Sequence, residues 1–270
     1  MLNDIINVDL HIHSKISEYK EAKKGKSGET IVSNSTVDKI YILLKKLNDN
    51  NINLFAFSDH NRFDSNLFKS TKQIIDNKKW ENIKNIVASV EFDVIITSGQ
   101  GPCHIITIFD VENDYQSDYI EKCISEFQLN KPCESYLIDD FEKLIKKIGL
   151  NTIFIAAQRK SLDNPSGSDR SLSDSVDDVY EFLKVGFISA LEFQKIKVEG
   201  ILMDNLKDFP KEIGLVCGSD CHQWEYYPKH DELSENDDKK FYFSIKALPT
   251  FKGLLLSLTS PKTRLRRNIR

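Results

Sequence analysis

Seven short runs of apolar residues, separated by amphipathic segments, constrain the fold of this 270-residue chain more than any other feature. Most of the runs are nearly all apolar, which is typical of strands buried on both faces of a parallel sheet. Two intervals show helical spacing of apolar residues: Val37–Leu47, behind a capping-box-like Ser35–Asp38, and Leu137–Ile148. The alternation predicts an α/β fold whose parallel sheet is open or closed into a barrel, with the ligand site at the carboxyl ends of the strands. The predicted strands are 7–10, 53–57, 86–97, 104–109, 152–156, 190–193 and 215–218.

The composition narrows the class of protein. With 40% hydrophobic and 29% charged residues, the chain resembles neither a disordered protein nor a coiled coil or collagen. It has no apolar run of about 18 residues and no signal-peptide pattern, so we predict no membrane span and expect a cytoplasmic protein. Five scattered cysteines without a C-x2-C pair are expected to be reduced thiols. The net charge of −4 gives no global attraction to nucleic acid, so a polyanion has to meet local basic patches.

Five of the six histidines lie at the ends of predicted strands, close to acidic residues, whereas His230 stands apart in a charged loop. Residues i and i+2 of an extended chain point the same way, so His11 and His13 face one cavity, as do Asp220 and His222. A lone H-x-H pair is most often structural, but the whole set in this order predicts a metal centre. The predicted metal-binding residues are His11, His13, His60, Glu91, His104, Asp220 and His222.

Imidazole and carboxylate together suit Zn, Mn or Fe, and a bridging carboxylate holds two ions about 3.5–4 Å apart. Such ions lower the pKa of a bound water and neutralise charge on a phosphoryl oxygen, so the predicted chemistry is hydrolysis. Asp9 and Asp59 are expected to orient the ligating imidazoles.

Four motifs in order carry a resemblance to a known family: D-x-H-x-H at 9–13, S-D-H at 58–60, the apolar-flanked Glu91 and G-S-D-x-H at 218–222. They resemble the motifs of the polymerase and histidinol phosphatase (PHP) family, and the resemblance covers most of the chain. It implies a distorted barrel of seven β/α units that binds up to three metals and hydrolyses phosphomonoesters or phosphodiesters.

The resemblance also implies an assignment of ligands. His11, His13, Glu91 and Asp220 would hold the first metal; Glu91 and His104 would hold part of the second; His60 and His222 would hold part of the third. Asp220, His222 and His60 are expected to serve catalysis directly.

Two positions depart from the family pattern. The family has A-H-P at the end of strand five, where this chain reads I-A-A-Q-R at 155–159, so either Ala157 or Gln158 takes the place of that histidine, and the ligand is missing. Tyr19 stands where the family has a further histidine. Three occupancies remain open: one firmly held ion with exchangeable neighbours, a full two- or three-metal enzyme, or a metal-poor domain without catalysis.

Basic and polar residues near the predicted site suggest where substrate binds. Lys15 opens a lysine-rich loop after the first strand, and Arg62 follows the S-D-H motif, so both are candidates to grip phosphate, together with Gln158 and Arg159. A solvated loop and an ordinary surface salt bridge are the alternatives for Lys15 and Arg62. Residues 160–170 form either a lid or a passive loop.

The segment 243–265 is similar to the one that closes the PHP domain in bacterial proteins that continue into an SMC-like or AAA-like ATPase. Those proteins resemble phage-defence and nucleic-acid-processing machines. We therefore expect a phosphoesterase barrel over 1–258, and over 259–270 a basic tail or linker towards an ATPase partner or domain; its arginines are Arg264, Arg266, Arg267 and Arg270.

The sequence thus predicts a metal-dependent phosphoesterase, in the first place a nuclease that works with an ATPase. A phosphomonoesterase for a small molecule or nucleotide is the first alternative. A catalytically degraded metal-binding interaction module is the second. The sequence alone does not decide whether the substrate is DNA or RNA, which metal is bound, or whether the chain forms a homo-oligomer.

Overall fold

The computed structural model describes residues 5–96, 102–130, 135–157, 183, 186–193, 196–209, 211–234 and 241–266. Gln158, Arg159 and the segment 160–170 lie outside the described residues. The described strands form a five-stranded sheet of order β11-β10-β1-β2-β3 and a six-stranded sheet of order β6-β4-β5-β7-β8-β9. The α/β class predicted from the sequence is confirmed.

All seven predicted strands are present, with ends that move by a few residues. They are β1 (Ile5–Ile12), β2 (Leu54–Phe57), β4 (Ala88–Ile95), β5 (Cys103–Phe109), β7 (Thr152–Ala156), β8 (Ala190–Glu192) and β9 (Gly214–Val216). Four shorter strands add to them: β3 (Asn85–Ile86), β6 (Tyr136–Leu137), β10 (Phe243–Lys246) and β11 (Leu265–Arg266). The apolar runs supply most of the core, because their side chains are buried on both faces of the sheets.

The prediction of a parallel sheet is wrong for β5, which pairs antiparallel with both β4 and β7. The connection from Ile95 to Cys103 is too short for a parallel crossover, which takes a dozen or more residues, whereas it suits two antiparallel strands. Because β5 runs antiparallel to β4, the start of β5 lies beside the carboxyl end of β4. His104 pairs in register with Asp93 near the carboxyl end of β4 and so reaches the site from the opposite chain direction.

The two sheets meet at the edge where β1, β2 and β4 approach one another. Two isolated parallel bridges join the sheets at two junctions: Ile12 of β1 pairs with Cys221, which follows β9, and His60, which follows β2, pairs with Glu91 of β4. Within the described strands the pairing is not continuous around the ring, so closure into a seven-unit barrel stays a prediction.

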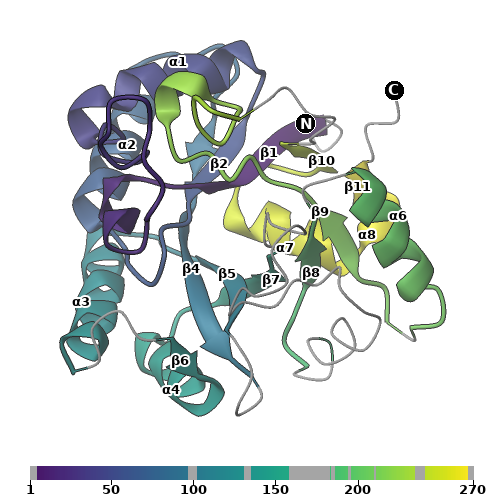
Figure 1. The fold of residues 1–270 in the computed structure, drawn as a ribbon. Coiled ribbons are helices and arrows are strands. Elements are labelled where there is room, and N and C mark those ends of the chain that lie inside the picture. Colours follow the sequence, from purple (N-terminus) through teal and green to yellow (C-terminus); the bar gives the residue numbers. More distant parts are fainter. Residues whose placement is uncertain are drawn as a thin grey trace.

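Helices cover the outer sides of the sheets, with α1, α2 and α3 along one side and α6 and α8 along the other (Figure 1). The predicted helices are confirmed as α1 and α4. The bounds are α1 (Ile40–Asp49), α2 (Ser65–Asn77), α3 (Asp114–Asn130), α4 (Ile138–Ile148), α6 (Ile196–Asn205), α7 (Phe251–Thr259) and α8 (Pro261–Arg264), with 3-10 turns η1 (Lys15–Tyr19), η2 (Val37–Lys39) and η3 (Trp224–Tyr226).

The predicted capping box at Ser35 is wrong. The turn η2 begins after Thr36, whose side chain makes no capping hydrogen bond. The buried hydroxyl of Ser35 instead donates to the backbone oxygen of His222 at 2.7 Å. Ser35 therefore ties the start of this helical segment to the loop that carries two predicted metal-binding residues.

The last described residues pack on the first sheet. Leu265 and Arg266 of β11 pair with β10, and Arg264 Nη1 donates to the backbone oxygen of Lys246 at 2.9 Å. Arg267 and Arg270 lie outside the described residues, and the division of the chain after residue 258 stays a prediction.

Among the helices that the structure describes, none combines the length and the apolar character needed to cross a membrane. Four cysteines (Cys103, Cys123, Cys217 and Cys221) are buried and not in disulfides, as expected; Cys133 lies outside the described residues.

Candidate metal centre

The structure brings all seven predicted metal-binding residues together where the two sheets meet. His11 and His13 come from the end of β1, and His60 follows β2. Strands β4 and β5 supply Glu91 and His104, and the loop after β9 supplies Asp220 and His222. Four of them, His11, His13, Glu91 and Asp220, are called the central cluster below.

The donor atoms of the central cluster are spaced as the ligands of one ion would be. His11 Nε2 lies 3.4 Å from Glu91 Oε2 and 3.7 Å from Asp220 Oδ1. His13 Nε2 lies 3.5 Å and 3.4 Å from the same two oxygens. Ligands at 2.0–2.2 Å from a tetrahedral ion stand about 3.4 Å apart, and these four imidazole-to-carboxylate separations agree with that spacing.

Each of the three innermost imidazoles has its Nδ1 held by the protein. Nδ1 of His11 lies 2.9 Å from Glu192 Oε2, Nδ1 of His13 lies 3.2 Å from Ser17 Oγ, and Nδ1 of His222 lies 3.0 Å from the backbone oxygen of Asp220. Carboxylate and carbonyl oxygens only accept, and Ser17 Oγ already donates to Asp59, so each Nδ1 carries the proton. This leaves Nε2 of each ring facing away from these partners, and wherever the ring is neutral the Nε2 lone pair is available for a metal.

Buried polar atoms without a hydrogen-bond partner test whether these residues fit a metal. Among the described residues, His11 Nε2, His13 Nε2, His60 Nδ1 and Glu91 Oε2 are such atoms. His60 Nδ1 lies 3.0 Å from Glu91 Oε2 but outside hydrogen-bond geometry. Burying four polar atoms without hydrogen-bond partners around one point costs free energy unless a ligand binds between them. The residues therefore fit a divalent cation.

The charge states agree with this fit. Burial lowers the pKa of His13 to about 3, and burial also lowers the pKa of His222 well below its usual range. Both rings are therefore neutral at pH 7, as metal ligands have to be. Burial acts in the same direction on His11, but the carboxylates of Glu192 and Glu91 outweigh it and raise the pKa of His11 well above 6.5. A metal at Nε2 of His11 has to displace a proton.

Glu91 is the shared carboxylate of the site. Burial alone would raise the pKa of Glu91, but His104, His11 and His60 hold it well below its usual range. Its Oε2 faces the central cluster, and its Oε1 accepts a hydrogen bond from His104 Nδ1 at 2.8 Å. Glu91 therefore joins the central cluster to the start of β5.

Three acidic residues at the site were missed by the sequence analysis. Glu192 ends β8 and holds His11; Asp93 lies two residues after Glu91 and 3.4 Å from His104 Nε2; Glu21 Oε2 lies 3.3 Å from His222 Nε2. Glu192 and Asp93 are acids inside otherwise apolar strand runs, and that signal was available in the sequence. Glu21 carries no such signal, since it lies in a polar loop.

The placement of His230 outside the site is wrong. Its ring is buried, stacks edge-on against His222 with centroids 4.1 Å apart, and donates from Nδ1 to the backbone oxygen of Asp220 at 2.6 Å. Asp220 itself has a left-handed backbone, with φ of 49°, which asparagine and aspartate tolerate better than most residues. The carbonyl of this strained residue thus receives two imidazole donors.

Among the described contacts, Asp9 and Asp59 make no direct hydrogen bond to an imidazole, so they support the ligating residues only indirectly. Asp9 accepts from the backbone nitrogens of His11 and Ser219, and Glu192 is the carboxylate on the His11 ring. Asp59 reaches His13 only through Ser17, whose hydroxyl lies between them. Asp9 therefore holds the chain that carries the ligands, because it lies deeper along β1 than the rings.

A groove with a volume of about 660 Å³ is lined by Ser14, which follows His13 in the chain, and by the candidate phosphate-binding residues Lys15 and Arg62, but by none of the seven predicted metal-binding residues. Arg62 is stacked 3.8 Å above the ring of Tyr19, whose hydroxyl donates to the backbone oxygen of His60. Tyr19, which stands where a histidine was expected, therefore supports the wall of the groove. Gln158 and Arg159 lie outside the described residues.

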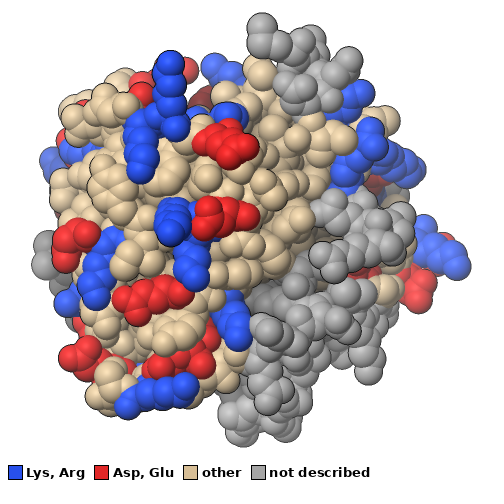
Figure 2. Space-filling view, turned by 90° about the horizontal axis from the view of Figure 1, so that it is seen from above, with Lys and Arg blue, Asp and Glu red and all other residues tan. Residues whose placement is uncertain are grey.

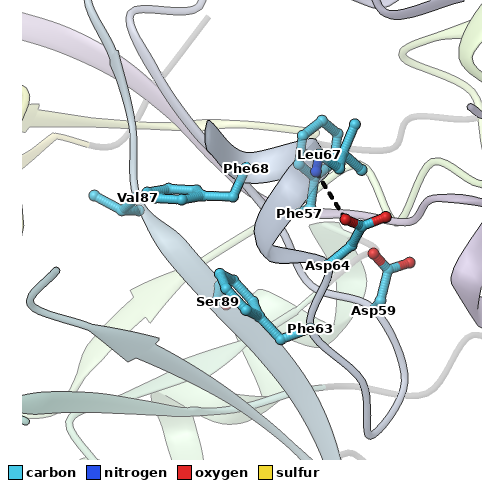
Figure 3. Close-up of a pocket in the computed structure, with 8 residues that line it drawn as sticks. All are labelled: Phe57, Asp59, Phe63, Asp64, Leu67, Phe68, Val87 and Ser89. Carbon is cyan, nitrogen blue, oxygen red and sulfur yellow. Dashed lines mark hydrogen bonds between the residues drawn. The ribbon is translucent and has the colours of Figure 1, made fainter. Parts of the chain in front are cut away.

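A second cavity behind Asp59 is too small for a substrate. Its volume is about 10 Å³, room for one water at most, and its walls are mainly apolar (Figure 3). The carboxylate of Asp64 there accepts from the backbone nitrogen of Leu67 and so caps α2, as Figure 3 shows. This cavity belongs to the packing behind the site.

No protein-family model and no curated protein matches the chain. Among solved structures, it is similar to PsfC from Pseudomonas syringae PB-5123, with 9% identity, a TM-score of 0.47, and coverage of 96% of this chain and 99% of that one. It is also similar to a protein from Bifidobacterium adolescentis provisionally named a metal-dependent phosphoesterase, with 12% identity, a TM-score of 0.49, and coverage of 86% and 92%.

A third similar structure is an amidohydrolase from Chromobacterium violaceum with bound sulfate and no metal, with 11% identity, a TM-score of 0.45, and coverage of 80% and 87%. At these identities and TM-scores below 0.5, the likenesses carry no argument about the reaction. The chemistry has to be argued from the side chains of this chain.

Proposed function

We propose that this chain is a metal-dependent phosphoesterase whose principal ion is held by His11, His13, Glu91 and Asp220. The observation that carries the proposal is the set of four buried, unpaired polar atoms around Glu91. Their separations and the neutral Nε2 of His13 match what a Zn, Mn or Fe site needs.

A divalent ion in this position supplies Lewis acidity, which lowers the pKa of a water and neutralises charge on a phosphoryl oxygen. Glu192 and Ser17 keep the rings of His11 and His13 oriented. The side chains of these two histidines are at most 3% exposed. His60 and His104 are the more accessible rings, at 15% and 17%. Substrate therefore approaches from their side of the site.

Within this proposal the substrate is a phosphodiester of nucleic acid. Lys15 and Arg62 support that choice, because both line the large groove, and a guanidinium can grip a phosphate with two hydrogen bonds. Cooperation with an ATPase, with a role in phage defence, stays a prediction from the C-terminal sequence.

A small phosphomonoester is the second candidate, and the surface charge favours it. On the face seen in Figure 2, the described Lys and Arg residues alternate with Asp and Glu and do not merge into one basic stripe. A long polyanion is normally bound by such a stripe, whereas a small substrate needs only the groove.

The test pairs metal analysis with hydrolysis. Purified protein is analysed for bound metal by mass spectrometry. It is then assayed with Mn²⁺ on single- and double-stranded DNA and RNA and on p-nitrophenyl phosphate. The Asp220→Ala variant should lose metal and activity, while Asp118→Ala, which removes an exposed carboxylate paired with Lys69, should keep both.

Cleavage of nucleic acid that disappears in Asp220→Ala supports the nuclease. Activity on p-nitrophenyl phosphate alone selects the phosphomonoesterase. Bound metal without turnover of any substrate would overturn the proposal in favour of an interaction module, and metal-free protein would overturn the metal site itself.

A further inference from the structure

We propose that the ammonium group of Lys20 occupies the place of a second metal ion beside Asp93 and His104, so that each chain holds a single divalent ion. The inference rests on the proposed function and adds to it the metal stoichiometry. Asp93, His104 and Lys20 are called the Asp93 set below.

The residue types beside Asp93 are those of a second metal site. His60, Asp93 and His104 each offer a ligand atom, and the three atoms lie within 4.8 Å of one another. The Asp93 set also adjoins the central cluster, since His104 Nδ1 lies 2.8 Å from Glu91 Oε1. By composition and position alone, two metal ions bridged by Glu91 would be expected here.

The polar atoms of Asp93 are already used, in contrast to those of the central cluster. Asp93 Oδ2 forms an ion pair with Lys20 Nζ and accepts from Asn61 Nδ2 at 2.7 Å. Asp93 Oδ1 lies 3.4 Å from His104 Nε2. Among the described residues, the buried unpaired polar atoms include none from Asp93 or His104.

The turn η1 and its hydrogen bonds position Lys20 beside Asp93. The turn η1 leaves β1 directly after the H-x-H pair and is tied down by Asp59, which accepts from Ser14 N at 2.6 Å and Ser17 Oγ at 2.7 Å. Lys20 follows the turn, and its side chain is 23% exposed against 2% for Asp93. An ammonium held over a buried carboxylate neutralises the charge that a second ion would otherwise neutralise.

The other side of the site agrees with this assignment. Ala157, directly after β7, is buried, and its backbone N–H donates to the carbonyl oxygen of His104 at 2.9 Å. Its methyl group cannot coordinate. A divalent ion beside Lys20 would meet like charge at short range, which is repulsive in a poorly solvated site.

The experiment counts metal ions. Wild type, Lys20→Gln, Lys20→Arg and Lys24→Gln are loaded with Mn²⁺, desalted and analysed by mass spectrometry, with titration calorimetry for affinity. Lys24 is an exposed lysine of the same loop and serves as the matched control. Circular dichroism checks that each variant is folded.

We expect one equivalent for wild type, Lys20→Arg and Lys24→Gln, and two for Lys20→Gln, with the second ion bound at least about tenfold more tightly than in wild type. The double variant Lys20→Gln with Asp93→Asn should return to one equivalent. Two equivalents in wild type, or one in folded Lys20→Gln, would overturn the inference and leave the phosphoesterase standing. Metal-free wild type would overturn the proposed function instead.

Discussion

The central cluster and the Asp93 set both contain histidine and carboxylate, yet they differ in whether these polar atoms already have partners within the chain. In the central cluster, His11 Nε2, His13 Nε2 and Glu91 Oε2 are buried polar atoms without a hydrogen-bond partner among the described residues. In the Asp93 set the carboxylate is paired with Lys20. The difference teaches that donor types alone do not define a metal site: the cation already supplied by the chain has to be counted as well.

Removing the charge of Glu91, which belongs to the central cluster and accepts a hydrogen bond from His104 of the Asp93 set, should have the largest effect. Glu91→Gln keeps the shape but takes away the charge that faces His11, His13 and His60. We expect metal affinity and hydrolysis to fall by more than about 100-fold, beyond the loss usual for an outer partner of a ligand. Titration calorimetry and steady-state assays measure this, with the exposed Glu126→Gln as control. A variant that retained full metal affinity would contradict the shared role of Glu91.

Crowding the central cluster alone should be the next largest effect. A Cβ added at Gly218 would lie 2.5 Å from both His11 Cβ and Glu192 Oε1. We expect Gly218→Ala to lower the free energy of unfolding by about 1–3 kcal/mol and to weaken metal binding, because His11 has to move.

The control is Gly200→Ala, since a Cβ there meets nothing within 4 Å. Gly200 lies inside α6, so that change should stabilise by about 0.5–1 kcal/mol. Urea unfolding compares the two. Equal stabilities would show that the central cluster tolerates displacement of His11.

Neutralising the orienting carboxylate should act on the central cluster and spare the Asp93 set. Glu192→Gln can still accept from His11 Nδ1 but no longer supports its basicity. We expect metal affinity to fall by about tenfold, which is about 1.4 kcal/mol. Calorimetry on wild type and variant measures it, and a Lys20→Gln background should show the second ion unaffected.

The pH dependence of stability tests two buried carboxyl groups, Asp9 and Asp59, that support these regions. Burial raises the pKa of Asp9, beneath the central cluster, and of Asp59, beneath η1, from 3.8 to about 6. Between these values the folded state keeps a proton that the unfolded state releases, so each group lowers stability as pH rises from about 4 to 6, by at most about 1.4 kcal/mol per pH unit. Above pH 6 the loss is complete.

Asp9→Asn or Asp59→Asn should therefore make the slope of unfolding free energy against pH more positive in that window. Urea unfolding of metal-free protein at several pH values gives the slope. An unchanged slope would show that the carboxyl concerned titrates normally. The slope is the useful quantity, because the amide also alters hydrogen bonds by an amount that does not depend on pH.

The sequence predicts the strands and most of the site because both are indicated by the types and spacing of residues that are close together in the chain. Mostly apolar runs identify β1, β2, β4 and β7, and polar residues after β1 and β9 identify His13 and Asp220. Those signals depend on side-chain type and spacing, which a single chain displays.

The remaining features depend on contacts between distant residues. The direction of β5 follows from the short connection after Ile95, a cue that was present and overlooked. The roles of His230, Glu21 and Lys20 follow from the path of two loops over the site, which no local pattern encodes. Ser35 illustrates the same limit, since its hydroxyl serves His222 and not the helix that its motif predicted.

The pairing of β4 with β5 has a consequence for the order of folding. Glu91 and His104 are separated by 13 positions, whereas His11 and Glu192 are separated by 181 and His11 and Ser219 by 208. Contacts of short sequence separation close at low entropic cost, so we expect this hairpin to form early and the central cluster to assemble last. Uptake of the ion during refolding, followed by a metal-sensitive dye, should then coincide with the final kinetic phase and report that the two ends of the chain have met.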